Sequence, residues 1–504
     1  MPGKLNKILA GAVLGLALAA LLVQFSGSLF DYFTQAVAAI RYPYSLDYGE
    51  GPLLDQTLRL ARFENIYRPS FDEPPYTISN YPPLFPLVQV PFAWAFGPAF
   101  WYGRAIAIAG VVATALFIFL TLRALTHQWI GPLIGGLLVM AFPYVQHWSM
   151  FNRVDELALA LSWAALYVTV RWVGLPDGES TALRRRGFWL AVVLFTGSIY
   201  TRQTYALAAP LAAFVWLLFM RRYRRALELG AAAGGLALAL FILLNLLTAG
   251  GFYLNIVVAN VNTFFWRTVE NYAKEIRDRL YILWGAAALF LLLERFIARG
   301  RTRTWPLAGV YLLAAAGGAI TIGKDGSNVN YLLELSAALS FAVGAAFTWL
   351  GSLGWSGRRW LQAGLAAALA FQVYNMAEWT RDRFITYMID RTSKLNSVAG
   401  AFQEVAAADG IVLADEYMGL VPLAGKRLYF QPFEYKQMYD AGLWDENPFL
   451  LDIANQKFDV ILWYTPATWR AVEARWTKGQ RDAITSYYQI TARYGDILVY
   501  TPRR

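Results

Sequence analysis

Long runs of apolar residues, separated by short polar connections, occupy most of the chain before residue 378. Each run comes close to the roughly 20 residues that an α-helix needs to cross the hydrocarbon core of a bilayer. The pattern therefore predicts a polytopic α-helical membrane protein with about eleven transmembrane helices. These helices are expected near residues 8–25, 104–122, 129–147, 155–174, 187–201, 203–220, 230–248, 280–297, 305–322, 331–350 and 359–377.

One apolar segment does not fit a crossing helix. Residues 81–98, YPPLFPLVQVPFAWAFGP, are few and are interrupted by prolines, which break or kink a helix. We expect an interfacial or re-entrant helix at this place, within an elaborated first external loop that covers residues 27–103.

The pattern changes after residue 378. Short β-rich runs at 410–417, 457–464 and 495–502 alternate with helix-like or polar segments. The sequence therefore predicts a transmembrane domain over residues 1–378 and a small soluble α/β domain over residues 379–504.

Composition agrees with this class and excludes others. Hydrophobic residues make up 57% of the chain and charged residues only 15%, which is too apolar for an ordinary soluble fold. The chain has no cysteine, so disulfides, thiolate metal sites and cysteine nucleophiles are excluded. The net charge of +10 does not indicate nucleic acid, because the basic residues gather in short connections between apolar runs.

Those basic connections predict the orientation of the protein. They alternate along the chain, and cytoplasmic connections are the ones enriched in Lys and Arg. The N-terminus is then cytoplasmic, and the first loop and the C-terminal domain lie on the external side of the cytoplasmic (inner) membrane. The four basic clusters are Arg184–Arg186, Arg221–Arg225, Arg295–Arg303 and Arg358–Arg359.

Candidate chemistry gathers on the predicted external side. The first loop carries two carboxylates in SLDYGEGP, and three later connections on the same side carry further charged residues. Ionisable groups at a membrane boundary usually have partners or functions. Plain structural roles stay open for several of them: a loop cap, a pair of acids that begins a helix, or an arginine paired with a nearby acid. The residues are Asp47 and Glu50 in the first loop, Arg153, Asp155 and Glu156 in NRVDE, Arg202, and Lys324 in GKDGSN.

Four motifs together resemble the C-type glycosyltransferase superfamily, integral membrane enzymes that include the protein O-mannosyltransferases and the aminoarabinose transferases of lipid A. They are the acidic motif of the first loop, YPPL at 81–84, WYGRAIAIAG at 101–110 and NRVDELALALSWAALY at 152–167. The resemblance covers roughly residues 5–220. Two departures stand out, because Asp47 and Glu50 are not adjacent and Tyr81 occupies the place of the usual histidine.

The resemblance implies transfer of a sugar from a polyprenyl-phosphate donor to an acceptor hydroxyl of a lipid, glycan or protein at the outer membrane face. A carboxylate would accept the proton of that hydroxyl, and cations would stabilise the phosphate that leaves. No cofactor is assigned, and a need for a divalent metal stays open. The expected roles are Asp47 and Glu50 as catalytic carboxylates, Arg153, Arg202 and Lys324 as ligands of the donor phosphate, and Tyr48, Tyr81, Asp155 and Glu156 as substrate-binding residues.

Two other classes of function stay open. A transporter or lipid flippase commonly shows repeats and binding groups near the midplane of the bilayer, whereas the charged residues here are expected at external helix ends. An assembly subunit that has lost activity but kept the fold is the second alternative. The presence of both Asp47 and Glu50 argues against it.

Overall fold

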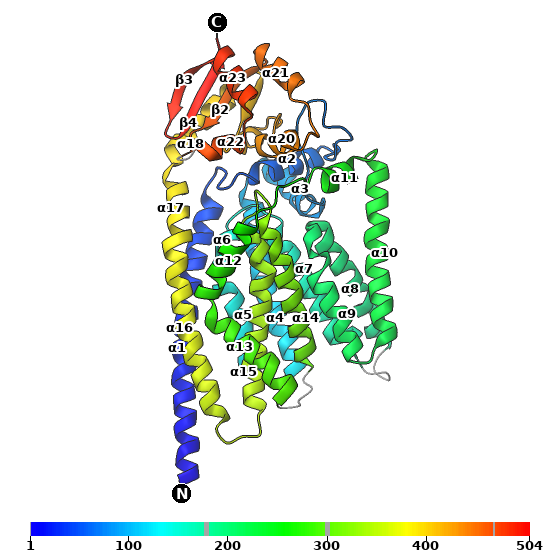
Figure 1. Ribbon diagram of the computed structural model, residues 1–504, viewed down its shortest axis with the longest axis vertical. Helices are drawn as coiled ribbons and strands as arrows, with labels where there is room; N and C mark the ends of the chain where they lie inside the picture. Colours follow the sequence, from blue (N-terminus) through cyan, green and yellow to red (C-terminus); the bar gives the residue numbers. More distant parts are fainter. Residues whose placement is uncertain (1, 176–180, 298–302, 467–468, 504) are drawn as a thin grey trace.

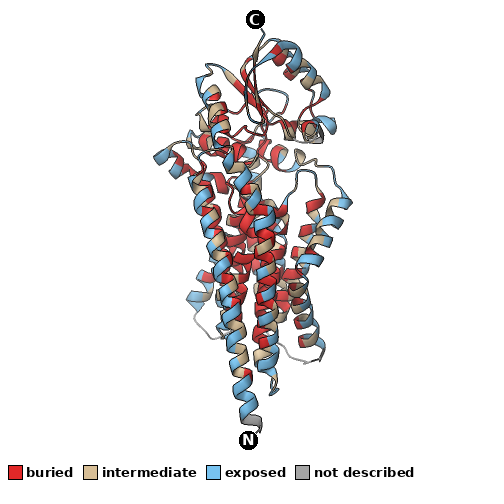
Figure 2. Cartoon of the chain, turned by 90° about the vertical axis from the view of Figure 1, so that its left-hand side faces the viewer, coloured by how far each residue is buried: buried red, intermediate tan, exposed pale blue. Residues whose placement is uncertain are grey.

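The computed structural model describes residues 2–175, 181–297, 303–466 and 469–503. A bundle of helices carries a smaller domain with a β-sheet at one end, and the chain termini lie at opposite ends of the molecule (Figure 1). Residues of the bundle interior and of the sheet are buried, whereas the outer helix faces are exposed (Figure 2). Exposed leucine, valine and phenylalanine side chains on those outer faces are what a lipid-facing surface requires.

The bundle consists of helices of unequal length. They are α1 (Pro2–Arg41), α4 (Trp101–Thr126), α5 (Ile130–Ala141), α6 (Pro143–Trp148), α7 (Asp155–Val168), α8 (Thr181–Thr201), α9 (Ala208–Phe219), α10 (Tyr223–Leu247), α13 (Tyr281–Leu292), α14 (Thr304–Ala319), α15 (Leu333–Ser352) and α16 (Arg358–Thr380).

Within the described residues, 6 helical segments are long and apolar enough to cross a membrane. They are Leu5–Arg41, Trp101–Thr126, Asp155–Val173, Tyr223–Leu247, Thr304–Gly323 and Val329–Ser352. The chain is therefore a multi-pass membrane protein, but the predicted count of about eleven helices is not confirmed. One reason is visible at the expected helix 129–147, which Pro143 divides into α5 and α6.

The first helix is longer than the sequence suggested. α1 continues to Arg41, so the loop that follows it begins at residue 42 rather than at residue 27. Polar side chains in its second half do not end the helix, because the Ser26 hydroxyl donates to the Leu22 carbonyl at 2.8 Å. Asp31 pairs with Arg381 at 2.9 Å, where α1 runs along α16 (Figure 1).

Short helices of the connecting loops lie between the bundle and the C-terminal domain. Two of them, α2 (Glu50–Ala61) and α3 (Leu84–Phe96), lie side by side directly below that domain (Figure 1). Further loop helices are α11 (Gly251–Tyr253) and α12 (Trp266–Arg279). Close packing fixes α2 against the domain, since a Cβ at Gly51 would lie 2.7 Å from the backbone nitrogen of Gly419.

The C-terminal domain is built on a sheet of four strands in the order β1-β2-β4-β3. β1 and β2 are parallel, whereas β4 is antiparallel to both of its neighbours. The strands are β1 (Ile411–Ala414), β2 (Phe458–Tyr464), β3 (Tyr488–Tyr494) and β4 (Ile497–Pro502). The sequence did not predict β3, an edge strand with mostly exposed or half-buried residues and no clear apolar face.

Helices surround this sheet and connect it to the bundle. α17 (Thr386–Ser393) continues upward from α16, and α18 (Leu395–Ala407) leads into β1 (Figure 1). The remaining helices are α19 (Leu420–Leu423), α20 (Pro432–Asp440), α21 (Asn447–Ala454), α22 (Trp469–Glu473) and α23 (Lys478–Tyr487).

Candidate active site

A cavity of about 390 Å³ lies where the bundle, the first loop and the C-terminal domain meet. Residues from all three parts of the chain line it. Most of the predicted site residues are among them: Asp47, Tyr48, Tyr81, Arg153, Arg202 and Lys324. Glu50, Asp155 and Glu156 are not.

Asp47 and Arg153 form an ion pair at the cavity wall. Arg153 Nε lies 3.1 Å from Asp47 Oδ2, and the side chains are 16% and 17% exposed. The Gly49 N–H also donates to Asp47 at 3.0 Å. Burial opposes the charge of Arg153, but Asp47 and other nearby acidic groups outweigh burial and raise the pKa of the guanidinium.

Glu50 lies outside the cavity, although the sequence placed it beside Asp47 as a candidate catalytic carboxylate. Its carboxylate accepts two bonds from Arg104, at 2.7 and 2.8 Å, and one from each of the Leu46 and Asn152 backbone N–H groups, at 2.6 and 2.7 Å. The side chains of Glu50 and Arg104 are both fully buried. Glu50 is thus enclosed by donors at the first residue of α2 and does not line the cavity, and its catalytic role stays a prediction.

Asp155 and Glu156 lie at the start of α7, behind the cavity wall. Asp155 forms an ion pair with Arg202 and accepts a hydrogen bond from Trp148 Nε1 at 2.7 Å. Glu156 is buried, and neither of its oxygens has a hydrogen-bond partner among the described residues. Neither acid lines the cavity, so their predicted contact with substrate stays a prediction.

Two further cations face the cavity from separate loops. Arg202 follows α8, and its guanidinium lies 4.5 Å from the centre of the Tyr331 ring. Lys324 follows the 3-10 turn η5 (Ile320–Gly323), and within the described residues its ammonium group has no ion-pair or hydrogen-bond partner. An unpaired ammonium in a cavity is available to an anion.

The C-terminal domain supplies cavity residues that sequence reasoning missed. The Tyr48 hydroxyl donates to Glu434 Oε2 at 2.7 Å and accepts from the Phe433 N–H at 3.2 Å. Burial raises the pKa of Glu434 above its ordinary value, and burial together with Glu434 raises the pKa of Tyr48. Arg475 lies 5.7 Å from the centre of the Tyr48 ring. No local signal could have shown these contacts, because Tyr48 and Glu434 are 386 positions apart.

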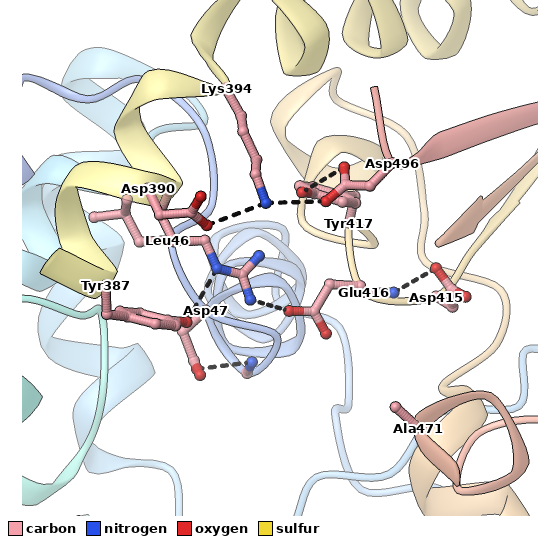
Figure 3. Close-up of polar contacts among 12 residues, drawn as sticks. Leu46, Asp47, Tyr387, Asp390, Lys394, Asp415, Glu416, Tyr417, Ala471 and Asp496 are labelled. Atoms are coloured by element: carbon pink, nitrogen blue, oxygen red, sulfur yellow. Dashed lines mark hydrogen bonds and ion pairs between the residues drawn. The ribbon is translucent and has the colours of Figure 1, made fainter. Parts of the chain in front are cut away.

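Ion pairs connect the sheet of the C-terminal domain to α17, the helix that leads into this domain from the bundle. Glu416 accepts from Arg391 of α17 at 2.5 Å and also pairs with Arg475, which lines the cavity. Lys394 lies between Asp390 and Asp496, at 3.1 Å from each (Figure 3). These ion pairs therefore connect α17, the sheet and the cavity wall.

Comparison with known proteins identifies the fold. No protein-family model matches the chain, and no curated protein matches it. Solved structures do match. The crystal structure of ArnT from Cupriavidus metallidurans bound to undecaprenyl phosphate is 14% identical, with 94% of this chain and 97% of that chain covered and a TM-score of 0.62. The crystal structure of the same protein in the apo state is 15% identical, with 95% of this chain and 97% of that chain covered and a TM-score of 0.58.

The archaeal oligosaccharyltransferase AglB from Archaeoglobus fulgidus, in complex with an inhibitory peptide and a dolichol-phosphate, is also similar. It is 12% identical, with 97% of this chain and 74% of that chain covered and a TM-score of 0.52. The chain has the C-type glycosyltransferase fold. The resemblance seen in the sequence motifs is thus confirmed at the level of the fold.

This C-type fold brings together three acids, four basic side chains and several neutral polar groups around one cavity. Asp47 can accept a proton, and Lys324 and Arg202 can face a phosphate. Among the described residues, no group of three or more His, Asp or Glu side chains is placed to hold a metal ion.

Proposed function

We propose that the chain is a glycosyltransferase that moves a sugar from a polyprenyl-phosphate-linked donor to an acceptor hydroxyl. The main observation behind this proposal is the cavity that holds the Asp47–Arg153 pair together with Arg202 and the unpaired Lys324. The similar ArnT structure contains undecaprenyl phosphate, and the AglB structure contains a dolichol-phosphate. Both ligands are polyprenyl phosphates, the class of lipid that carries the sugar in the proposed donor.

In the proposed reaction, the acceptor oxygen attacks the anomeric carbon of the donor sugar. The bond between that carbon and the phosphate oxygen breaks, and the electron pair leaves with the phosphate. Lys324 and Arg202 stabilise the negative charge that develops on the leaving group. Asp47 takes the proton of the acceptor hydroxyl, and Arg153 holds the Asp47 carboxylate in place.

We further propose that the cavity faces the external side of the cytoplasmic membrane. α8, α10 and α16 carry basic clusters in their first turns or just before them, and these helices begin at the end of the bundle opposite the C-terminal domain (Figure 1). Cytoplasmic helix ends are the ones enriched in Lys and Arg. The cluster Arg295–Arg303 lies partly outside the described residues, since residues 298–302 are not among them.

The position of the cavity favours a transferase over a transporter. Transporters commonly bind substrate near the midplane of the bilayer, between repeats of the fold. Here the charged residues of the cavity gather at one end of the bundle, below a soluble domain that contributes part of the wall.

A transfer assay with purified protein tests the proposal. The wild type should transfer sugar from a polyprenyl-phosphate donor, and Asp47→Asn should lower the turnover roughly a hundredfold, as expected for loss of a general base. Asp409→Asn, at an exposed position, is the matched control and should keep the wild-type rate. Wild-type turnover by Asp47→Asn would remove Asp47 from the mechanism. Substrate flux across vesicles without any glycosylated product would favour transport instead.

A further inference from the structure

Three amide side chains of the cavity wall have carbonyl oxygens without a hydrogen-bond partner in the described parts of the chain. They belong to Gln56, Asn80 and Gln203, which come from three separate segments. Gln203 Nε2 donates to the Asn80 backbone carbonyl at 3.0 Å, which uses one end of this amide and leaves its oxygen unpaired. We name these three residues the amide set.

The unpaired oxygens of the amide set destabilise the protein when no ligand is bound. A buried polar atom without a partner costs about 1–3 kcal/mol, and native proteins contain few of them. Gln56 is only 4% exposed. It follows Pro52 and Leu53 by one helical turn, and all three line the cavity, so α2 presents this face to it. Other amides of the described chain also have unpaired buried atoms, but these three line one cavity, where a ligand can complete them.

The charged side chains of the cavity limit the charge that the ligand can have. Three of its four cations already face an acid: Arg153 faces Asp47, Arg202 faces Asp155, and Arg475 faces Glu416. Lys324 alone among these cations has no such partner in the described residues. Lys324 therefore supplies the one unbalanced positive charge, which matches the single negative charge of a phosphodiester, while Arg202 faces the same phosphate with its own charge balanced by Asp155.

The three acids of the described cavity wall have different partners. Asp47 faces Arg153, and Glu434 accepts the Tyr48 hydroxyl. The remaining one, Asp325, is exposed and accepts the N–H of Gly326 at 3.1 Å. Apart from the exposed Asp325, Glu434 is the one carboxylate of the described cavity wall without an ion-paired cation, and burial raises its pKa, which favours the uncharged acid over a partner for the ammonium group of an amino sugar.

We propose that the amide set binds the hydroxyl groups of a neutral sugar, and that this sugar belongs to the donor. The assignment rests on the proposed glycosyltransferase function. Amide oxygens accept hydrogen bonds from hydroxyls without bringing a net charge. Gln203 directly follows Arg202, so the amide set adjoins the cations that face the donor phosphate. The same chemistry would also suit a neutral acceptor glycan, and the experiment separates the two sources.

The test compares three lipids in a binding assay with the purified full-length protein: bare polyprenyl phosphate, polyprenyl-phosphate hexose and polyprenyl-phosphate hexosamine. The wild type should bind the hexose lipid more tightly than either of the others. In Gln56→Leu, affinity for the hexose lipid should fall roughly 5- to 10-fold, as for the loss of a hydrogen bond to a ligand, while affinity for the bare lipid stays unchanged. Asn80→Ala should also lower the affinity for the hexose lipid and leave the affinity for the bare lipid unchanged.

Stability gives a second and independent readout. Gln56→Leu removes an unpaired buried amide, so the ligand-free variant should have a Tm equal to or above that of the wild type. The control is Gln146→Leu, which is equally buried but does not line the cavity, and whose Nε2 donates to the Met140 carbonyl at 2.9 Å and to Ser28 Oγ at 3.0 Å. This control should lower the Tm and leave the preference among the three lipids unchanged.

Three outcomes would overturn the inference. If Gln56→Leu and Asn80→Ala bind the hexose lipid like the wild type, the amide set does not recognise the donor sugar. If their only change is a higher KM for a glycan acceptor, the sugar bound is that of the acceptor. Preference of the wild type for the hexosamine lipid would contradict a neutral sugar. Failure of the wild type to bind bare polyprenyl phosphate would be a different result, because it would contradict the proposed function itself.

Discussion

Asp47 and Glu50 stand close together in one loop, and each pairs with an arginine, but their surroundings differ. Asp47 and Arg153 meet at the wall of a cavity and are 17% and 16% exposed. Glu50 and Arg104 are fully buried, and four donors occupy the Glu50 oxygens. A carboxylate whose oxygens are all occupied can hold the fold together but has no room for substrate. The two pairs therefore separate an acid that faces a cavity from an acid enclosed by donors within four residues of sequence.

Loss of Arg104 should have the largest effect on stability. Arg104→Ala leaves the buried Glu50 charge without its cation, so the free energy of unfolding should fall by about 3–5 kcal/mol. Unfolding of the purified protein in detergent measures this change. The exposed pair of Arg62 and Glu64, at 3.0 Å, is the control, and Arg62→Ala should cost less than about 1 kcal/mol. Equal losses in both variants would mean that the Glu50–Arg104 pair is no more structural than a surface pair.

A third carboxylate, Asp415, extends the contrast to an acid that is buried without a direct ion pair. It accepts from Trp476 Nε1 at 3.1 Å and from backbone N–H groups, and burial raises its pKa to about 6. A raised folded-state pKa means that stability is lost as the pH rises from about 4 to about 6. Relative to Asp415→Asn, the wild type should lose roughly 2–3 kcal/mol over this range. Parallel stability profiles of the two proteins between pH 4 and pH 7 would contradict this expectation.

Two glycines beside the acids should respond differently to an added methyl group. A Cβ at Gly49 would collide with the guanidinium of Arg153, whereas a Cβ at Gly51 would meet the backbone of Gly419. A side chain moves more easily than backbone, so Gly49→Ala should mainly reduce turnover, by roughly tenfold, with little change in Tm. Gly51→Ala should mainly reduce stability, by about 1–3 kcal/mol. Each variant serves as the control of the other, and a matching loss of Tm in both would erase the distinction.

The smallest expected effect on stability is that of removing Lys324, the cation of the cavity that is unpaired within the described chain. Lys324→Ala removes a charge that no acid of the described chain neutralises, so the protein should unfold at an unchanged temperature. The kcat/KM for a polyprenyl-phosphate donor should fall by roughly tenfold, with weaker binding of the donor. Lys478→Ala, at an exposed position of the C-terminal domain, is the control. Unchanged donor affinity in Lys324→Ala would exclude Lys324 from the phosphate site.

The amino-acid sequence alone determined the membrane class, several of the long helices and the resemblance to C-type glycosyltransferases. These properties follow from local patterns, because an apolar run long enough to cross a bilayer can be recognised without knowing its neighbours. The motifs around Asp47 and Arg153 are local in the same sense, and the structure brings these two residues to one cavity.

Only the tertiary structure decided which of the charged residues face that cavity. Glu50 was a second candidate beside Asp47, but Arg104, 54 positions away, pairs with its carboxylate. The contributions of Glu434 and Arg475 depend on how the C-terminal domain docks onto the first loop, which no spacing along the chain predicts. Pairing between charges depends on distance and burial in three dimensions, so a sequence can nominate ionisable residues but cannot assign their partners.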